Sequence, residues 1–342
     1  MKRCHVEWVA LVWVVCYALS ATGEENNRVE KSGENESKTK ATITQQMGVI
    51  RFQSGTELVT EYHIAPEVAK PYFYPLLAKG GVPVTRDWPM KVGEDKESRD
   101  HVHQKSGWFC YGDIVPEGLK LTSKIRGVEG VDFWSEAKGH GKIVCKKVDE
   151  PKGNRITTYN EWQTASGETI LNEVRTIELK LVGENRLLIL EIELIAKEYP
   201  ILFADTKEGA LGLRVHDQLT VDRGHGILSN AKGDIGEKKV WGYLSNWCDY
   251  SGKVNGKEVG VTIFDDEKNP YRSVWHSRNY GLSAANPFGR KKSGFPAMKG
   301  RTDLVRLAKG EKLKLRYGIL LHPGNAQTGK VAESYTRFMN KN

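Results

Sequence analysis

The chain has 342 residues, a formal charge of +8, 35 glycines and only 5 cysteines. This length allows one large domain or two ordinary ones. The few, unevenly spaced cysteines exclude a disulfide-rich scaffold, and no Cys-x-x-Cys pair predicts a zinc site. The basic residues are scattered rather than gathered in a stripe or a recognisable module, so nucleic-acid binding is not expected.

The first 22 residues predict a secretory signal peptide. Lys2 and Arg3 form a positive start, Trp8 to Leu19 form an apolar run, and the small residues Ser20 and Ala21 follow. The run is too short to span a bilayer, and no later segment is long and apolar enough to do so. We therefore expect a secreted or periplasmic protein without a membrane span.

Residues 23–46 predict a disordered spacer. They are rich in Glu, Asn, Lys, Ser and Thr and nearly free of apolar side chains, so burial cannot offset the entropy of ordering them. Residues 47–342 contain no linker and no shift in composition, which predicts a single domain.

Period-two alternation predicts β-strands through most of this domain. Strands are expected at residues 48–53, 57–63, 142–148, 155–164, 174–181, 186–196, 210–215, 258–264 and 312–321. Residues 183–185 form the expected hairpin turn between two of the long strands, and 328–339 has the spacing of a C-terminal helix. Many long antiparallel strands with little helix predict an all-β fold, a large antiparallel β-sandwich.

Three histidines are candidate site residues. His101 and His103 form a His-x-His pair, which on a strand would point both imidazoles to one face. Together with His276 they are candidate proton-transfer groups, metal ligands or structural residues, because imidazole titrates near neutral pH and also binds metals. A metal would need a third ligand, from His276, Glu173 or Asp249, but no spacing identifies it.

Glu208 is the first choice for a catalytic carboxylate, because it stands at the start of an expected strand beside a glycine that allows close approach. General acid–base catalysis needs one histidine and one nearby carboxylate. Arg86, Arg214 and Arg278 are candidates for binding sugar hydroxyls or a uronate carboxylate, since guanidinium is a planar, multiple donor. Arg214 has apolar neighbours, so a structural pair with an acidic residue is the alternative.

Trp108 and Trp275 are expected to stack on a sugar ring, and Asn286 is a further candidate for substrate binding. Flat aromatic rings beside charged hydrogen-bonding groups are typical of sugar sites. The alternative is that both tryptophans belong to the core.

Several aromatic and polar motifs together resemble those of a known family. In chain order they are Thr85-Arg86-Asp87-Trp88-Pro89, Asp100-His101-Val102-His103-Gln104-Lys105-Ser106, Trp247-Cys248-Asp249-Tyr250-Ser251-Gly252, Trp275-His276-Ser277-Arg278-Asn279-Tyr280-Gly281 and Asn286-Pro287-Phe288-Gly289. Their order resembles the secreted bacterial "PmoA family", also called methane oxygenase proteins, over most of residues 47–325. Members usually carry a histidine where Gln104 stands here, so the chain departs from any dense metal cluster of the family.

The long-stranded architecture also resembles the galactose mutarotase-like superfamily of β-sandwiches. This resemblance implies a secreted carbohydrate-active protein, such as a sugar epimerase, lyase or related enzyme with His/Glu acid–base chemistry on a concave sheet face. A non-catalytic carbohydrate-binding protein is the first alternative, and the metal-dependent oxygenase implied by the "PmoA" name is the second. The expected partner is a carbohydrate or another small polar ligand, with no cofactor and no resident metal.

Overall fold

The computed structural model describes residues 40–92 and 97–340, which fold mainly into antiparallel β-sheets. The nine-stranded sheet has the strand order β1 (Ala41–Gln46), β2 (Val49–Ser54), β3 (Glu57–His63), β4 (Tyr72–Ala78), β6 (Gly107–Tyr111), β13 (Gly209–Arg214), β18 (Leu282–Asn286) and β17 (Val274–Trp275), with β5 (Val82–Pro83) paired to β4. The expected all-β, mainly antiparallel fold is confirmed.

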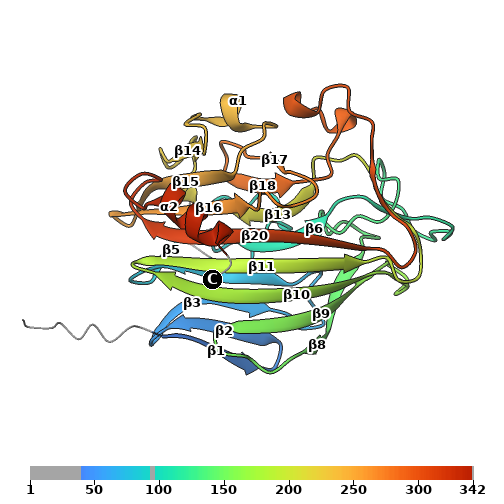
Figure 1. Ribbon diagram of the computed structural model, residues 1–342, viewed down its shortest axis with the longest axis horizontal. Helices are drawn as coiled ribbons and strands as arrows, with labels where there is room; N and C mark the ends of the chain where they lie inside the picture. Colours follow the sequence, from blue (N-terminus) through green and yellow to red (C-terminus); the bar gives the residue numbers. More distant parts are fainter. Residues whose placement is uncertain (1–39, 93–96, 341–342) are drawn as a thin grey trace, which may run out of the picture. The chain divides into compact units, whose positions relative to one another are not determined.

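A second sheet of eight strands contains the longest strands of the fold (Figure 1). Its order is β14 (Ile227–Asn230), β15 (Trp247–Val254), β16 (Lys257–Asp265), β20 (Lys312–Pro323), β11 (Asn185–Ile195), β10 (Thr169–Val182), β9 (Arg155–Gln163) and β8 (Lys142–Val148). A small sheet joins β19 (Val305–Leu307), β12 (Ile201–Phe203) and β7 (Ile114–Pro116). The helices are α1 (Glu237–Val240), α2 (Val331–Met339) and the 3-10 turns η1 (Asp217–Leu219), η2 (Lys291–Ser293) and η3 (Pro296–Met298).

The structure confirms the predicted hairpin of β10 and β11, with a turn one residue shorter than expected. Val182 pairs with Asn185, so the turn consists of Gly183 and Glu184, and Asn185 already belongs to the second strand. Gly183 has a φ of 61°, a conformation that glycine adopts without the steric cost of a side chain.

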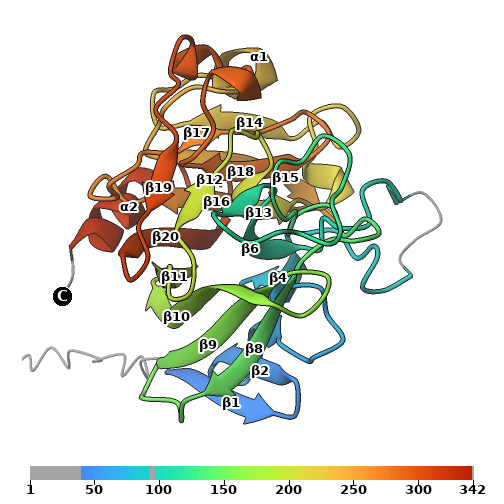
Figure 2. The same ribbon diagram turned by 90° about the vertical axis from the view of Figure 1, so that its right-hand side faces the viewer.

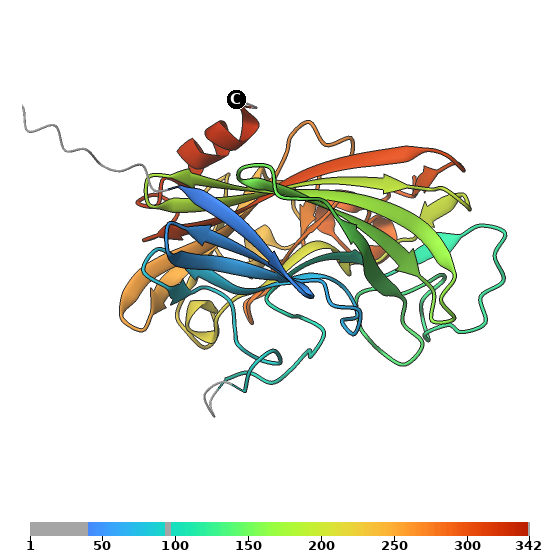
Figure 3. The same cartoon turned by 90° about the horizontal axis from the view of Figure 1, so that it is seen from below.

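Alternation along β11 separates two apolar clusters. Leu188 and Leu190 point into the main core, which fills the space between the two large sheets. Leu187 and Ile189 point to the opposite face, where α2 covers them with Val331. Figure 3 shows α2 on this outer face of the eight-stranded sheet. The fold therefore buries both faces of the sheet where α2 lies.

The C-terminal helix and the first strand differ from the prediction. The helix begins at Val331 rather than at residue 328, because residues 325–328 form a turn in which the Asn325 side chain accepts backbone hydrogen bonds. Strand β1 lies within the segment that was expected to be a disordered spacer, so the domain begins before residue 47. β1 is an edge strand that pairs through its backbone with β2, so it needs few apolar side chains.

The predicted signal peptide and residues 23–39 of the predicted spacer lie outside the described residues. None of the helices in the described part of the chain has the length and apolar character to cross a membrane. Cys110, Cys145 and Cys248 are free thiols, and Cys110 and Cys248 are buried.

Candidate functional site

A pocket of about 380 Å³ brings together all four predicted catalytic residues, His101, His103, Glu208 and His276. All the residues that line it lie in connections between strands rather than in the strands themselves. This differs from the expected concave sheet face. The sheet contributes instead by fixing the ends of these connections, since β6 and β13 are neighbouring strands and β18 pairs with β13.

The connections that form the pocket come from distant parts of the sequence. One precedes β6, another follows β7, a third precedes β13 and a fourth joins β17 to β18. Figure 2 shows the segments before β6 and after β7 beside the ends of β6 and β13. Antiparallel pairing of central strands thus places residues from positions 101 to 280 around one hollow.

His101 and His103 lie in a loop, so the strand geometry that would point both imidazoles to one face does not apply to them. His101 has a φ of 43°, in the left-handed region, and β6 begins only at Gly107. The two rings nevertheless meet, with centroids 5.7 Å apart at an interplanar angle of 79°. The His101 ring also stacks in parallel on Tyr280, at 5.3 Å.

Asp100 orients His101. The Nδ1 atom of His101 lies 2.9 Å from Oδ2 of Asp100. The other carboxylate oxygen of Asp100 accepts hydrogen bonds from Arg86 and Arg214, each at 2.7 Å. These two guanidinium groups outweigh the effect of burial and hold the pKa of the Asp100 carboxyl well below its usual range. Because Nδ1 is bound to an ionised carboxylate, Nε2 is the nitrogen of His101 available to a ligand.

His276 is buried, with 3% of its surface exposed, and its Nδ1 donates a hydrogen bond to the backbone carbonyl of Lys207 at 3.0 Å. The proton on Nδ1 leaves Nε2 as an acceptor. Burial, followed by the positive charges of Lys207 and Arg278, lowers the pKa of His276 to about 3. His276 is therefore neutral at physiological pH and ties its loop to the residue that precedes Glu208.

The carboxylate of Glu208 makes no hydrogen bond or ion pair with any residue that the structure describes. Burial raises the pKa of Glu208, and the charge of Asp132 adds to this effect against the opposing charges of Lys207 and Arg278. Gly112 lets this segment come close, because its amide donates to the Glu208 carbonyl at 2.8 Å and a Cβ there would lie 2.7 Å from the Glu208 Cβ. A half-buried carboxyl group without a partner is typical of functional sites.

Arg278 is the one predicted binding arginine that lines the pocket. Its Nε forms an ion pair of 2.9 Å with Glu237, and the other oxygen of Glu237 accepts from the Asn279 amide at 2.7 Å. Tyr250 donates to the Arg278 carbonyl at 2.6 Å. Both the backbone and the side chain of Arg278 are thus fixed from outside the pocket.

Arg86 and Arg214 are buried and bind the protein rather than a ligand, which corrects their predicted role. Besides Asp100, Arg86 binds the carbonyl of His101 at 2.9 Å, and Arg214 binds the Gln104 side chain at 2.7 Å. Arg214 thus has the acidic partner that its apolar neighbours implied. The two arginines support the loop that carries His101 and His103.

Trp108, Trp275 and Asn286 are also corrections, because each is buried with 0% of its surface exposed. Both tryptophans belong to the main core, as the alternative prediction held, and offer no face to a sugar. Asn286 donates to the Thr206 carbonyl at 3.0 Å and accepts from the amides of Phe288 and Gly289. Its role is to hold the loop that leads to Glu208.

The aromatic residues that line the pocket are Trp134 and Tyr280, which were not predicted. Trp134 packs edge-on against Trp108, with centroids 5.1 Å apart, so Trp108 stands one layer behind the pocket wall. Burial raises the pKa of the Tyr280 hydroxyl. No signal in the sequence distinguished Trp134, because both it and its neighbour Phe133 also pack in the main core.

Of the three proposed third metal ligands, His276 lies in the same pocket as His101 and His103, whereas Glu173 and Asp249 do not line it. Glu173 is buried and binds Arg175, Asn160 and Trp162. Asp249 is buried against His322 at 2.8 Å. Within residues 40–92 and 97–340 there is no group of three or more His, Cys, Asp or Glu side chains that could hold a metal ion.

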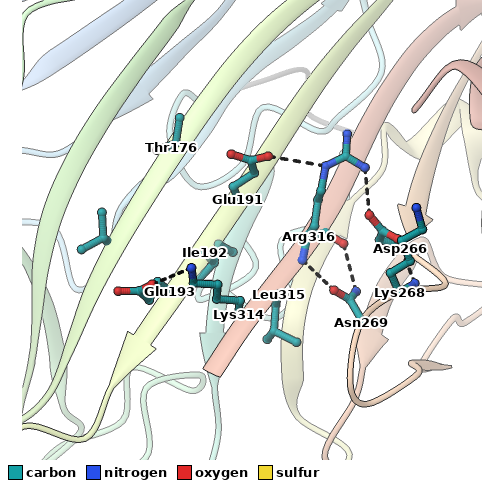
Figure 4. A pocket seen from close by; sticks show the side chains of 11 residues that line it. Thr176, Glu191, Ile192, Glu193, Asp266, Lys268, Asn269, Lys314, Leu315 and Arg316 are labelled. Atoms are coloured by element: carbon teal, nitrogen blue, oxygen red, sulfur yellow. Dashed lines mark hydrogen bonds and ion pairs between the residues drawn. The ribbon is translucent and has the colours of Figure 1, made fainter. Parts of the chain in front are cut away.

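A second hollow, of about 400 Å³, lies on the outer face of the eight-stranded sheet (Figure 4). Arg316 stands at its centre, between Asp266 at 2.9 Å and Glu191 at 3.7 Å. Glu193 pairs with Lys312 and Lys314 at 2.7 and 3.3 Å. The acidic groups of this hollow are therefore neutralised by neighbouring side chains.

Comparison with solved structures finds weak similarity to carbohydrate-related proteins. A galactose mutarotase-like protein from Lactobacillus casei has a TM-score of 0.38 and 11% identity, with 82% of this chain and 100% of that chain covered. A galactose mutarotase-like protein from Clostridium acetobutylicum has a TM-score of 0.37 and 12% identity, with 84% and 99% covered. The GH36 α-galactosidase AgaA from Geobacillus stearothermophilus has a TM-score of 0.38 and 8% identity, with 85% of this chain covered.

The chain spans 42% of the length of that α-galactosidase. Comparison with curated proteins found no match. A family described as a family of unknown function, DUF6807, matches residues 49–336. The narrower resemblance to "PmoA family" proteins stays a prediction. Evidence on function therefore has to come from the pocket itself.

Proposed function

This chain belongs to the DUF6807 family, whose function is unknown, and from the geometry of its pocket we propose that it catalyses proton transfer on a carbohydrate. The observation that supports this most directly is the meeting of an unpaired carboxyl group, Glu208, with three imidazoles in one hollow. The volume of this hollow falls in the range of small-molecule sites, about 300–1,000 Å³. Pairs of titratable groups whose surroundings differ are typical of acid–base catalysis.

Glu208 is the general base in this proposal. No neighbouring cation neutralises its carboxylate within the described part of the chain, so it is free to accept a proton from a ligand. Its raised pKa makes it a stronger base than an ordinary glutamate once it is ionised.

His101 is the general acid. Asp100, held by two buried arginines, fixes the ring through Nδ1, so Nε2 is the nitrogen that delivers a proton to the ligand in this proposal. Among the residues that the structure describes, neither His103 nor His276 has a carboxylate partner of this kind, and burial lowers the pKa values of both, to about 4 and about 3. These two rings instead accept hydrogen bonds from ligand hydroxyls.

The reaction that needs only these groups is opening and closure of a sugar ring at the anomeric carbon. Glu208 takes the proton of the anomeric hydroxyl while His101 gives a proton to the ring oxygen, and the bond between that oxygen and the anomeric carbon breaks. The product is the open-chain aldehyde, which closes by the reverse steps. Protons and electrons balance without a cofactor.

The test is NMR exchange spectroscopy of anomers in a panel of neutral and acidic sugars, with and without the purified protein. We expect accelerated exchange for at least one sugar and its loss in Glu208→Gln. Binding of a sugar by the wild-type chain without any accelerated exchange would contradict the catalytic proposal and favour the non-catalytic alternative.

Secretion is part of the same proposal. The predicted signal peptide implies that the protein acts outside the cytoplasm, on sugars that reach the periplasm or the medium. Amino-terminal sequencing of the protein recovered from those fractions should give a start close to residue 23. Recovery only from the cytoplasm with Met1 in place would contradict it.

A further inference from the structure

Two cationic side chains line the pocket, Lys207 and Arg278. The Nε atom of Arg278 lies 2.9 Å from a Glu237 carboxylate oxygen, as an ion pair without hydrogen-bond geometry. Its two terminal nitrogens, Nη1 and Nη2, have no partner among residues 40–92 and 97–340. Lys207 is exposed and likewise makes no ion pair within these ranges. A guanidinium fixed through Nε presents its terminal nitrogens end-on, an arrangement that binds both oxygens of one carboxylate.

The wall behind His101 adds a surplus of positive charge. Arg86 and Arg214, with 0% and 1% of their side chains exposed, share the single carboxylate of Asp100. Two cations and one anion leave one net positive charge close to the pocket.

The wall behind His103 and Trp134 repeats this arrangement. Lys70 and Lys105 share the single carboxylate of Glu136, at 2.7 and 2.8 Å. Lys70 is buried, and it also donates to the Trp134 carbonyl at 3.1 Å. A second net positive charge therefore stands behind a different part of the pocket wall.

Two acidic residues of the lining, Asp132 and Glu208, oppose part of this positive charge. Asp132 accepts hydrogen bonds from the amides of Trp134 and Ser135 and from the Ser135 hydroxyl, so its carboxylate oxygens are directed to its own loop. The pKa of His103 reflects this positive charge. Burial lowers it most, and the charge of Lys70 lowers it further, to about 4.

We infer that the pocket selects a sugar acid, whose carboxylate binds end-on to Nη1 and Nη2 of Arg278 while its hydroxyls reach Glu208 and the histidines. This inference rests on the proposed function and adds the charge of the substrate to it. A planar carboxylate matches the two parallel donors of the guanidinium, whereas a neutral sugar would leave them unpaired.

The experiment is isothermal titration calorimetry of the mature chain with galacturonate, glucuronate, galactose, glucose, galactose 6-phosphate and the methyl ester of galacturonate. We expect one of the two sugar acids to bind at least about 10-fold more tightly than its neutral counterpart and its ester, because hydrogen bonds between charged groups are stronger than those to neutral ones. Affinity should fall as salt screens the positive walls. Equal binding of acid, neutral sugar and ester, or tighter binding of the phosphate, would overturn the inference.

Variants locate the carboxylate. Arg278→Gln should weaken sugar-acid binding about 10-fold or more and leave neutral sugars unaffected, with Arg278→Lys in between. Arg301→Gln is the matched control, because Arg301 is an exposed arginine paired with Asp303 outside the pocket. Unchanged sugar-acid affinity in Arg278→Gln would overturn the inference.

If that variant does not fold, Lys207→Gln tests the positive charge on the exposed side of the pocket. Unchanged sugar-acid affinity and unchanged salt dependence in Lys207→Gln would count against the inference.

Binding and turnover separate the two proposals. Sugar-acid binding that depends on Arg278 but brings no accelerated exchange supports this inference and overturns the catalytic proposal. Accelerated anomeric exchange of neutral sugars, without tighter binding of sugar acids, supports the catalytic proposal and overturns this inference. Failure of every sugar to bind overturns both.

Discussion

The pocket around Glu208 and the outer hollow around Arg316 have similar volumes, about 380 and 400 Å³, but they differ in whether their carboxylates are paired with cations. In the outer hollow, Glu191, Glu193 and Asp266 each pair with a neighbouring cation. In the pocket, the Glu208 carboxylate has no such partner within the described ranges.

This difference shows that a hollow of a given size is not in itself a site. Exposed ion pairs on a sheet surface are common and contribute little, whereas a carboxyl group removed from water without a partner costs stability. An unpaired, partly buried carboxyl group is therefore typical of a functional site. The strongest tests compare a variant in the pocket with a matched variant in the outer hollow.

Glu208→Gln against Glu193→Gln should give the largest contrast. Removing the base should lower turnover of any converted sugar about 100-fold or more, because general acid–base catalysis typically contributes about 10²–10⁴-fold. Glu193→Gln should leave turnover unchanged. The measurement is the anomeric exchange rate at saturating sugar, and equal rates in both variants would remove Glu208 from the chemistry.

Asp100→Asn against Asp266→Asn compares two carboxylates that hold buried guanidinium groups. Asp100→Asn should lose about 2 kcal/mol of unfolding free energy, because the Asp100 side chain is 41% exposed and solvent screens its ion pairs. Asp266→Asn should lose more, about 3 kcal/mol, because both partners of its pair with Arg316 are buried. Only Asp100→Asn should also lower kcat, with KM nearly unchanged, since it alone orients His101. Urea denaturation and kinetics measure the two effects, and a normal kcat in Asp100→Asn would contradict the positioning role.

His276→Gln should change how stability depends on pH. The pKa of His276 in the fold, about 3, lies below the usual 6.5, so the unfolded chain binds this proton first as the pH falls. The wild type should therefore lose stability relative to His276→Gln below about pH 6.5, by up to about 1.4 kcal/mol per pH unit. Denaturant titrations from pH 7 to 4 measure the difference, and the exposed His225→Gln serves as control.

Lys207→Gln against Lys314→Gln should give the smallest contrast. Lys207 is an exposed cation at the pocket, so its loss should weaken sugar-acid binding only a few-fold and flatten the salt dependence. Lys314 pairs with Glu193 in the outer hollow, and its loss should leave binding unchanged. An equal loss of sugar-acid affinity in both variants would mean that the net charge of the protein, rather than the position of Lys207, determines binding.

Periodicity predicted most long strands because one face of such a strand lies in the core and the other does not, as the alternating burial along β10 shows. It failed for the aromatic residues around β6, where all five residues are buried and alternation carries no information on which side faces a ligand. Trp108 was predicted from its flat ring beside charged residues, but Trp134, from a loop with no periodicity, lies between it and the pocket.

The sequence by itself determined the all-β character, the β10–β11 hairpin and the chemical types gathered in the pocket, because alternation, turn residues and reactive side chains are local properties. Only the tertiary structure decided which of them meet. Asp100 lies directly beside His101 in the sequence, yet its two arginine partners come from positions 86 and 214, and Glu208 differs from the acids of the outer hollow solely in what surrounds it. Whether a charge is paired depends on every chain segment that approaches it, and no local pattern records that.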